Sequence, residues 1–347
     1  MSLSPILHAL AALTDGRDLS CDEARALFTT MMSGEATPAQ IGGALLALRV
    51  KGETVDEIAG AAQAMRELSA RVTVAASHLV DTCGTGGSGA AKLFNISTAA
   101  AFVTAAAGAH VAKHGNRGMT SKSGSADVLE AAGVRIDLSP EQIGRCIAEV
   151  GVGFMFAPAH HGAMRHAAGV RRELGVRTLF NLLGPLTNPA GAPNQVIGVF
   201  HPDLQLPLAE VLRLLGSRHV LLVHADGLDE LSIAGPSFVV ELNDGRITDY
   251  TVTPRDFGLS EHRLDDLRAE SPAASLALVE VALGDPDSAA AAIVSLNAGA
   301  AIYAAGVATS LANGVAMAQD AIAAGLARER LDELVRVTKL MGAARDG

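Results

Sequence analysis

The chain is poor in aromatic residues. It has 347 residues with no tryptophan, two tyrosines and nine phenylalanines, so aromatic residues make up only 3% of it. The hydrophobic core must therefore rest on alanine, leucine, valine and isoleucine, within an apolar fraction of 49%. That fraction excludes general disorder. The length allows two domains, or one large domain with an appendage.

Cysteine and positive charge are also scarce. The three cysteines, Cys21, Cys83 and Cys146, are too few and too scattered for a disulfide framework or a zinc site. A reducing, cytoplasmic setting is the simplest interpretation. The formal net charge is −10. This acidic balance argues against a nucleic-acid partner, because neutralising phosphates requires surplus lysine and arginine.

Signals for secretion or membrane insertion are missing from the sequence. The N-terminus has no basic region ahead of its first apolar stretch. The alanine-rich stretch 99–113 is too short to span a bilayer, and the longer stretch 289–312 carries polar residues such as Asn297. We therefore expect no membrane partner.

The first seventy or so residues show the pattern of successive helices. Each expected helix begins with a serine or threonine followed three residues later by glutamate or glutamine, the capping-box arrangement. These pairs are Ser20 with Glu23, Thr37 with Gln40, and Thr54 with Glu57. The pattern predicts a small helical domain over residues 1–73.

Strands and helices alternate from about residue 74 to the C-terminus, residue 347. The sequence predicts strands at 78–81, 110–115, 134–137, 151–158, 194–200 and 218–225. Helices between strands indicate a mostly parallel sheet with right-handed crossovers, hence an α/β domain. A hairpin is expected around the Asn243-Asp244-Gly245 turn. In the segment 159–192 we expect a helix that Pro185 and Pro189 break into a loop.

A glycine-rich turn, GTGGSG at 84–89, follows the first expected strand. Glycine lets backbone N–H groups approach an anion, and a following helix N-terminus adds a favourable field. The turn is not a dinucleotide fingerprint, since no acidic residue occurs before Asp127. It is not a P-loop either, because Ala90 stands where lysine is required. A phosphate cradle of another kind and a tight packing turn remain as alternatives.

Two further polar segments follow. NIST at 95–98 opens a helix, where its side chains either only cap the helix or also reach a phosphate or metal. KHGNR at 113–117 ends the next expected strand, and SKSGS at 121–125 comes after it. Ligands of open α/β sheets bind beyond the carboxyl ends of strands, so this cluster predicts an anion site, with a solvated basic loop as the alternative.

Paired charges occur at two other places. Asp229-Glu230, just past a strand, suggests magnesium, although adjacent acids are also common on surfaces. His160-His161 is not a metal pair on one helical face, which requires a spacing of four. No serine or cysteine nucleophile stands out with a histidine and acid.

In their order along the chain, these motifs resemble the anthranilate phosphoribosyltransferase family. The resemblance covers nearly the whole chain. It rests on GTGG (84–87), NIST (95–98), KHGNR (113–117), SKSGSADVLE (121–130), RRELGVRTLFNLLGPLTNP (171–189) and GLDELS (227–232). Ser88 stands where the family commonly has aspartate, and Lys92-Leu93 replaces a usual small polar residue.

The resemblance implies an activity and a fold. Phosphoribose would pass from 5-phosphoribosyl 1-pyrophosphate (PRPP) to the amine of anthranilate, giving N-(5-phosphoribosyl)-anthranilate and pyrophosphate in tryptophan biosynthesis. The fold would be that of pyrimidine nucleoside phosphorylases, a helical domain that borrows helices from about 160–185 beside an α/β domain. The protein would work as a homodimer paired through the helical domain, with two Mg²⁺ ions at each site.

Family motifs also assign roles to residues. PRPP would contact Gly84, Gly87, Ser88, Asn95, Ser97, Thr98, Lys113, His114, Gly115, Asn116, Arg117, Ser121 and Ser125. Anthranilate would contact Gly84, His114, Asn116, His161 and Arg171. Magnesium would be held by Ser97, Asp229 and Glu230. No side chain is expected to be an obligatory acid or base, because an aromatic amine is already neutral near pH 7 and needs alignment more than deprotonation.

Other functions stay possible on sequence alone. A pyrimidine nucleoside phosphorylase of the same fold would use free phosphate and a nucleoside. A non-catalytic relative would bind nucleic acid, against which the charge of −10 and the Asp229-Glu230 pair speak. A scaffold protein would leave the polar loops at the strand ends unexplained.

Overall fold

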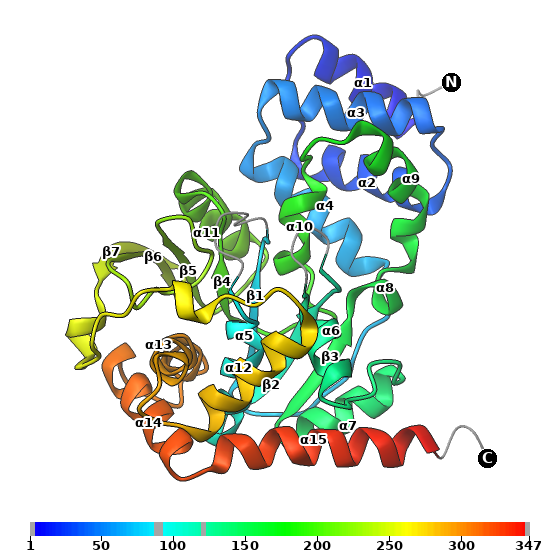
Figure 1. Cartoon of the computed structure of the whole chain (residues 1–347). Helices are drawn as coiled ribbons and strands as arrows, with labels where there is room; N and C mark the ends of the chain where they lie inside the picture. Colours follow the sequence, from blue (N-terminus) through cyan, green and yellow to red (C-terminus); the bar gives the residue numbers. More distant parts are fainter. Residues whose placement is uncertain (1–3, 87–92, 119–122, 344–347) are drawn as a thin grey trace.

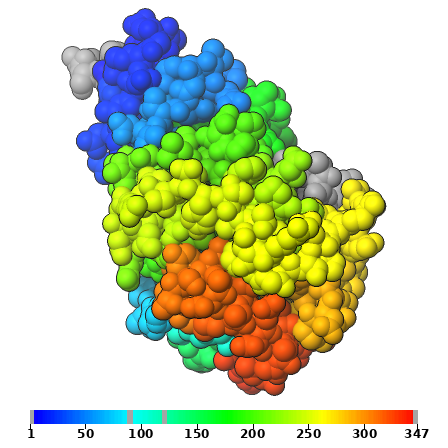
Figure 2. All heavy atoms as spheres, turned by 90° about the vertical axis from the view of Figure 1, so that its left-hand side faces the viewer, coloured from blue at the N-terminus to red at the C-terminus, as the bar shows by residue number. Residues whose placement is uncertain are grey.

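The computed structural model describes residues 4–86, 93–118 and 123–343. A bundle of helices forms one end of the molecule, and an α/β layer with the C-terminal helices forms the other (Figures 1 and 2). This arrangement confirms the predicted fold class: a small N-terminal helical region and a larger α/β region with a mostly parallel sheet. None of the helices in these ranges is long and apolar enough to cross a membrane.

Four helices begin the chain: α1 (Pro5–Thr14), α2 (Cys21–Ser33), α3 (Pro38–Lys51) and α4 (Val55–Glu67). The three predicted capping boxes all form, at the starts of α2, α3 and α4. In each, the side-chain oxygen of the first residue accepts a hydrogen bond from the backbone N–H three positions on, which satisfies a donor that the helix cannot. Gly34 ends α2 in the left-handed conformation, with φ at 86°.

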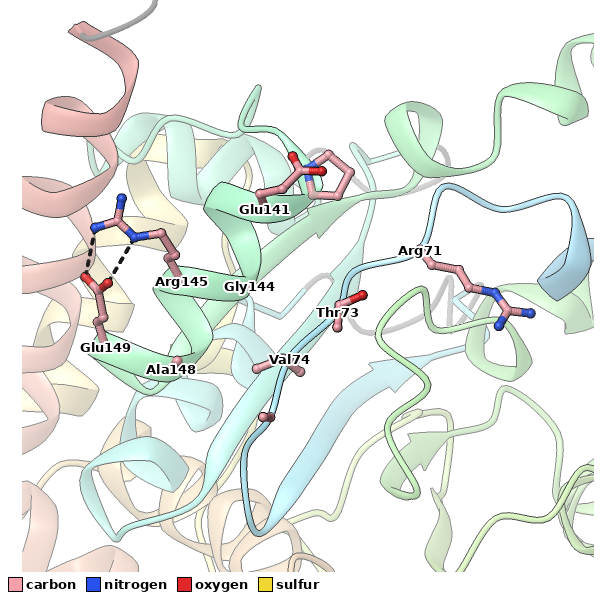
Figure 3. A pocket seen from close by; sticks show the side chains of 10 residues that line it. Arg71, Thr73, Val74, Glu141, Gly144, Arg145, Ala148 and Glu149 are labelled. Atoms are coloured by element: carbon pink, nitrogen blue, oxygen red, sulfur yellow. Dashed lines mark hydrogen bonds and ion pairs between the residues drawn. The ribbon is translucent and has the colours of Figure 1, made fainter.

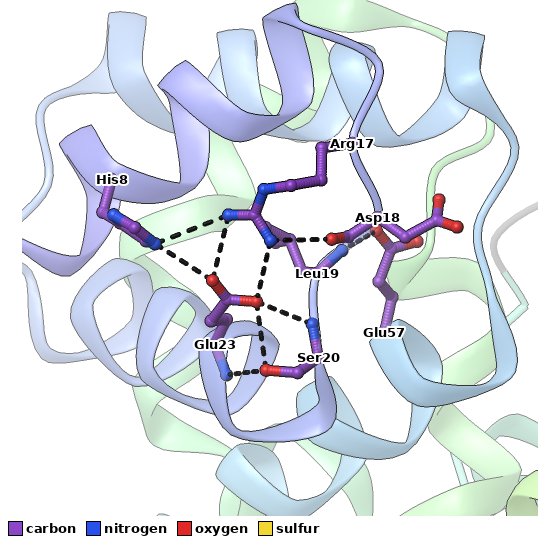
Figure 4. Close-up of polar contacts among 7 residues, drawn as sticks. All are labelled: His8, Arg17, Asp18, Leu19, Ser20, Glu23 and Glu57. Carbon is purple, nitrogen blue, oxygen red and sulfur yellow. Dashed lines mark hydrogen bonds and ion pairs between the residues drawn. The ribbon is translucent and has the colours of Figure 1, made fainter.

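The turn between α1 and α2 is fixed by two glutamates (Figure 4). Glu23 accepts hydrogen bonds from Arg17 and from the Ser20 backbone, which hold the pKa of its carboxyl well below its usual range. Glu57, fully buried on α4, accepts the Leu19 backbone N–H at 3.0 Å. The turn is thereby tied both to the helix that follows it and to α4.

Two later helices complete the bundle: α9 (Arg165–Leu174) packs against α2 and α3, and α10 (Phe180–Leu186) packs against α4. The short α8 (Ala157–His160) contacts β3. Phe180 meets Phe28 of α2 edge-on, with ring centroids 5.4 Å apart. The expectation that Pro185 breaks the helix is wrong, because Pro185 lies inside α10. It falls in the last turn, where a missing N–H forgoes only one bond before the chain leaves the helix at Thr187.

Seven strands form a single sheet in the order β3-β2-β1-β4-β5-β6-β7. They are β1 (Leu79–Gly84), β2 (His110–Gly115), β3 (Val152–Phe156), β4 (Asn194–Gly198), β5 (His219–Ala225), β6 (Ser237–Asn243) and β7 (Arg246–Val252). The strands β1 to β5 pair with one another in parallel, whereas the β5–β6 and β6–β7 pairs are antiparallel. The predicted hairpin turn is present, with φ at 45° for Asp244 and 85° for Gly245.

The predicted strand at 134–137 is absent. Val134 and Ile136 are buried, as a strand pattern requires, but the segment is irregular. The backbone N–H of Arg135 donates instead to Thr338 Oγ1 on the C-terminal helix, at 3.2 Å. A distant side chain therefore satisfies a backbone group that the local pattern assigned to a sheet.

Helices cover both faces of the sheet. They are α5 (Ile96–Ala106), α6 (Ser125–Ala131), α7 (Pro140–Val150), α11 (Gln205–Leu214), α12 (Pro272–Gly284), α13 (Ala289–Ala304), α14 (Leu311–Ala323) and α15 (Leu326–Ala343). Leu221 of β5 packs into the core shared with α5 and α13, whereas Leu222 packs into the core shared with α11 and the helical bundle. The helical bundle is thus seated on one face of the sheet.

A pocket of about 380 Å³ lies between α7 and the extended segment 71–75 (Figure 3). Its α7 side carries the ion pair of Arg145 with Glu149, at 3.0 Å. None of the residues predicted for the substrate or metal site lines this pocket.

Glu241 on β6 joins the hairpin to a helix beneath the sheet. Its carboxylate accepts hydrogen bonds from Tyr250 at 2.8 Å and from Tyr303 of α13 at 2.9 Å, and His219 Nε2 lies 2.8 Å away. The two donors are the chain's only tyrosines. Burial alone would raise the pKa of Glu241, but the hydrogen bonds from His219 and the tyrosines outweigh it and lower the pKa.

Glu241→Gln should reduce the free energy of unfolding at pH 7 by about 2–4 kcal/mol, because charge-assisted hydrogen bonds are replaced by poorer ones. The folded pKa lies below the unfolded one, so the carboxylate's contribution is present above about pH 4 and is lost as pH falls further. Urea denaturation at pH 7 and below pH 4 should show the difference shrinking in acid. The exposed Glu149→Gln serves as the control, and an equal loss there would contradict the assignment.

Candidate active site

The carboxyl ends of β1, β2 and β5 gather most of the predicted residues. β1 ends at Gly84, β2 ends with Lys113, His114 and Gly115, and the Asp229-Glu230 turn follows β5. α5, which begins next to Asn95, lies against β1 and β2. Parallel strands place their carboxyl ends at one edge of a sheet, which explains why motifs distant in sequence meet here.

The buried ammonium group of Lys113 lies at the centre of this edge. The side chain is only 2% exposed, and its Nζ donates to the Thr82 carbonyl oxygen at 2.6 Å. Ser97 Oγ lies 3.4 Å from the same nitrogen. Burial lowers the pKa of Lys113, while the charges of Asp81 and Glu230 oppose that shift.

Glu230 caps the start of helix α5. Its carboxylate accepts hydrogen bonds from the backbone and the side chain of Ser97. Burial and the neighbouring Asp229 raise the pKa of Glu230 to about 8, although Lys113 and Ser97 work in the opposite direction.

Two glycines allow the Asp229-Glu230 turn to lie directly on the sheet. A Cβ atom at Gly198, the last residue of β4, would overlap the Asp229 carbonyl oxygen. At Gly84 a Cβ would lie 3.1 Å from Asp229 Oδ2. Any side chain at Gly198 would therefore push the carboxylates away from β1 and α5.

Asp81 and Asn188 form a buried polar pair that sequence reasoning missed. Asn188 Nδ2 donates to Asp81 Oδ2 at 2.7 Å and to the Ala112 carbonyl oxygen at 2.8 Å, and the His114 N–H donates to Asp81 Oδ1 at 3.1 Å. Burial raises the pKa of Asp81, against the effect of these donors and of Lys113. The pair ties β1 to β2. The Asn-Pro dipeptide at 188–189, which the sequence marks as a turn, was its only signal.

His114 and His161 form a neutral pair with a defined tautomer. Burial lowers the pKa of His114 to about 3 and that of His161 to about 4. His114 Nδ1 lies 3.2 Å from the Gly184 carbonyl oxygen, which can only accept, so Nδ1 carries the proton. His114 Nε2 must then accept from His161 Nε2, at 3.2 Å. His161 Nδ1 is left as a buried acceptor without a partner among the described residues.

Asn95 connects the NIST motif to two other segments. Its Oδ1 accepts hydrogen bonds from Ser123 Oγ at 2.9 Å and from Ser275 Oγ of α12 at 2.7 Å. Nothing in the sequence singled out Ser275. Thr98, in the first turn of α5, is buried, and its Oγ1 has no partner among the described residues.

Arg117 is exposed and is paired within the protein. Its guanidinium group donates to both Asp127, at 3.1 Å, and Glu130 of α6. Asp127 also accepts the backbone N–H groups of Gly118 at 2.9 Å and Gly124 at 2.8 Å. Arg117 is thus paired with acidic side chains. A phosphate group of the predicted ligand would have to compete with these carboxylates for the guanidinium group.

The remaining predicted residues are more scattered. Asn116 is exposed, and its Oδ1 accepts the Arg117 N–H at 2.8 Å. Ser125, the first residue of α6, packs so closely on Gly115 that a Cβ there would lie 3.0 Å from Ser125 Cβ. Gly87, Ser88 and Ser121 lie outside the described residues, as does Lys92.

Arg171 belongs to the helical bundle. Its guanidinium carbon lies 5.1 Å from the centroid of the Phe180 ring, and burial lowers its pKa. In the described part of the chain no carboxylate pairs with it. A half-buried guanidinium without an anionic partner is suited to bind an anionic ligand.

The oxygen donors of this edge suit magnesium. Two carboxylates and one hydroxyl, from Asp229, Glu230 and Ser97, match the few hard ligands that Mg²⁺ takes from a protein beside water and substrate phosphates. Within the described ranges, no group of three or more His, Cys, Asp and Glu could hold a metal by itself.

Family models place the chain in one enzyme class. A model described as "Glycosyl transferase family, helical bundle domain" matches residues 7–69, and "Glycosyl transferase family, a/b domain" matches residues 76–328. The chain is therefore a glycosyltransferase of this class, with a helical bundle and a mostly parallel sheet. Acidic and basic side chains lie together at the ends of its strands.

Individual relatives narrow the assignment. The chain is 60% identical over 332 residues to the anthranilate phosphoribosyltransferase of Thioalkalivibrio sulfidiphilus, covering 95% of this chain and 98% of that one. It is 55% identical to that of Ectopseudomonas mendocina, over 99% of each chain. The crystal structure of the Thermus thermophilus enzyme superposes with a TM-score of 0.91 at 45% identity, covering 97% and 100% of the two chains. The chain belongs to the anthranilate phosphoribosyltransferase family, which confirms the resemblance found in its motifs.

Gly198→Ala should displace the Asp229-Glu230 turn, because the new Cβ would overlap the Asp229 carbonyl oxygen. Overpacking of this kind costs about 1–3 kcal/mol. We expect a lower melting temperature and a higher magnesium concentration for half-maximal activity. Gly235→Ala, where a Cβ meets nothing within 4 Å, is the matched control. Unchanged magnesium dependence in Gly198→Ala would show that the turn tolerates the shift.

Proposed function

We propose that the edge formed by β1, β2 and β5 is where this enzyme transfers phosphoribose from PRPP to the amine of anthranilate, a step of tryptophan biosynthesis. The proposal rests on one observation: Ser97 and Glu230, from two other motifs, lie near the buried ammonium group of Lys113. A cation, a helix start and acidic metal ligands at one sheet edge suit a doubly phosphorylated sugar.

PRPP would lie across the starts of the helices at this edge. The proposed contacts are Gly84, Gly87, Ser88, Asn95, Ser97, Thr98, Lys113, His114, Gly115, Asn116, Arg117, Ser121 and Ser125. Support comes from the Saccharomyces cerevisiae enzyme, solved in complex with PRPP and Mg, which shares 25% identity and superposes with a TM-score of 0.87 over 97% of this chain and 99% of that one. Among the described residues nothing accepts from the Thr98 hydroxyl, which leaves it as a proposed donor to a pyrophosphate oxygen.

Ser97, Asp229 and Glu230 would hold magnesium, and we propose two ions per site because adjacent carboxylates can each bind one together with pyrophosphate oxygens. Magnesium held there would neutralise charge on the departing pyrophosphate. Lys113, buried beneath Ser97, adds a fixed positive charge on the protein side. Donors that need no rearrangement stabilise a transition state best.

Anthranilate would lie between the sheet edge and the helical bundle, in contact with Gly84, His114, Asn116, His161 and Arg171. Arg171 would orient its carboxylate. His114 and His161 are both neutral, so they offer hydrogen bonds and no charge. Because the aromatic amine is neutral already, alignment against C1 of the ribose is the main requirement, and no obligatory base is needed.

The direct test is an assay of anthranilate fluorescence with purified protein, PRPP and Mg²⁺. Fluorescence should change only when both substrates and the metal are present, with release of pyrophosphate. Phosphate-dependent release of thymine from thymidine, without anthranilate turnover, would instead identify a nucleoside phosphorylase. Binding of single-stranded DNA at physiological salt without turnover would identify a non-catalytic relative.

Arg171→Ala should raise KM for anthranilate at least about tenfold and leave KM for PRPP within about twofold, because a lost charge-assisted hydrogen bond is worth about 1.5–3 kcal/mol. Saturating anthranilate should restore much of the turnover. The neighbouring, exposed Arg172→Ala is the matched control. Equal effects of the two substitutions would remove Arg171 from the substrate site.

The proposed assembly is a homodimer paired through the helical domain, residues 1–73 with the helices of 160–185, while 74–347 binds PRPP. Val50 on α3 is 87% exposed, and Leu46 one turn earlier is also exposed on the same side. An apolar stripe of this kind is suited to a second copy. A cytoplasmic location fits the three free cysteines.

Sedimentation equilibrium should give about twice the mass of one chain, 35.4 kDa. Val50→Glu should shift the protein toward monomers, because it places a charge in an apolar contact. The exposed Val281→Glu, on α12 of the α/β domain, is the control. A monomer at micromolar concentration in the unmodified protein would overturn the dimer.

A further inference from the structure

Asn95 lies at a junction of three chain segments. Ser275 Oγ, in the first turn of α12, donates to Asn95 Oδ1 at 2.7 Å and accepts the Asn95 backbone N–H at 3.0 Å. Ser123 Oγ donates to the same Oδ1 at 2.9 Å, and Asn95 Nδ2 donates to the Ser123 carbonyl oxygen at 3.3 Å. A residue 180 positions further along the chain is thus joined to both phosphate motifs through one amide side chain.

Ser275 is completely buried, at 0% exposure. Its hydroxyl uses both its donor and an acceptor position on Asn95. If the hydroxyl were removed, the Asn95 N–H would lose its partner and one of the two donors to Oδ1 would be gone. An unsatisfied polar group away from water is costly, so the junction would loosen rather than keep its geometry.

The segment before α12 reinforces the same junction. Phe94 N–H donates to the Leu267 carbonyl oxygen at 3.0 Å, and Leu93 forms an isolated β-bridge with Arg268. α12 itself packs against both α5 and α6, the helices that follow the two phosphate motifs. The C-terminal part of the chain therefore forms a frame to which both motifs are attached.

We propose that Ser275 is a positioning residue for PRPP binding. By fixing Asn95 it sets the separation between the start of α5 and the segment at Ser123. The hydroxyl of Ser275 makes its hydrogen bonds to Asn95 and is not proposed to contact the substrate. The inference rests on the proposed function, since it assigns a role in the same phosphate site.

Ser275→Ala should raise KM for PRPP about tenfold, as expected for the loss of about two hydrogen bonds between neutral groups. KM for anthranilate should stay within about twofold, because Arg171 and His161 belong to other segments. kcat should change less than KM for PRPP. The matched control is Ser271→Ala, which removes the hydroxyl that caps α12 through the Ala274 N–H at 3.1 Å and leaves Asn95 untouched. If Ser271→Ala raised KM for PRPP equally, the effect would come from the stability of α12 and the proposal would be wrong.

A double-mutant cycle tests whether Ser275 acts through Asn95. In an Asn95→Ala background, Ser275→Ala should raise KM for PRPP by much less than it does in the unmodified chain, because only the bond to the backbone N–H of residue 95 is left to lose. Independent, multiplicative effects would overturn the proposal. Ser123→Ala, which loosens the other side of Asn95 and leaves the buried contacts of α12 intact, should raise the same KM even if Ser275→Ala proves unstable.

Hydrogen exchange gives a readout without turnover. The backbone N–H of Asn95 donates a hydrogen bond to Ser275 Oγ. Exchange of this backbone hydrogen should therefore accelerate in Ser275→Ala and stay unchanged in Ser271→Ala. Unchanged exchange together with unchanged KM would overturn the proposal. If the unmodified protein fails to turn over anthranilate and PRPP, the proposed function fails, whereas faster exchange at Asn95 would still establish the junction.

Discussion

The site depends on one buried ammonium group. Lys113 lies among the ends of β1 and β2 and the start of α5, with acidic side chains around it. A charge taken out of water is tolerated only where hydrogen bonds and opposite charges compensate it. The Thr82 carbonyl oxygen, Asp81 and Glu230 supply that compensation. Because these compensating groups come from different motifs, burying the ammonium group also brings the motifs into contact. The charge balance of the core and the assembly of the site therefore depend on the same contacts.

Excess negative charge at this edge complements that ammonium group. Asp229 approaches the sheet so closely that a Cβ atom at Gly198 would overlap its carbonyl oxygen, and a Cβ at Gly84 would lie 3.1 Å from its Oδ2. Burial and, after it, the neighbouring Asp229 raise the pKa of Glu230 to about 8. A divalent cation held by Asp229 and Glu230 would favour their charged forms and would supply positive charge for the pyrophosphate group. Metal and substrate together would then complete the charge balance of this edge of the sheet.

Sequence patterns predicted what depends on neighbours in the chain. Each capping box was visible because its two partners are three residues apart, and the hairpin because Asp244 and Gly245 tolerate positive φ. The irregular segment at 134–137 was mistaken for a strand, because burial alternates there while Thr338, far along the chain, takes its backbone N–H. Local pattern determines which residues are buried, but only the tertiary structure determines where backbone hydrogen bonds go.

Candidate site residues divide in the same way. Lys113, Ser97 and Glu230 stand in motifs whose composition already indicated an anion and a metal. Ser275 stands in an ordinary alanine-rich helix, where a buried serine carries no pattern at all. Its importance arises only from a contact with Asn95 across 180 positions. Residues that touch a ligand need particular chemistry, whereas residues that hold them in place need only one hydroxyl at the right point. A sequence therefore shows the first group more readily than the second.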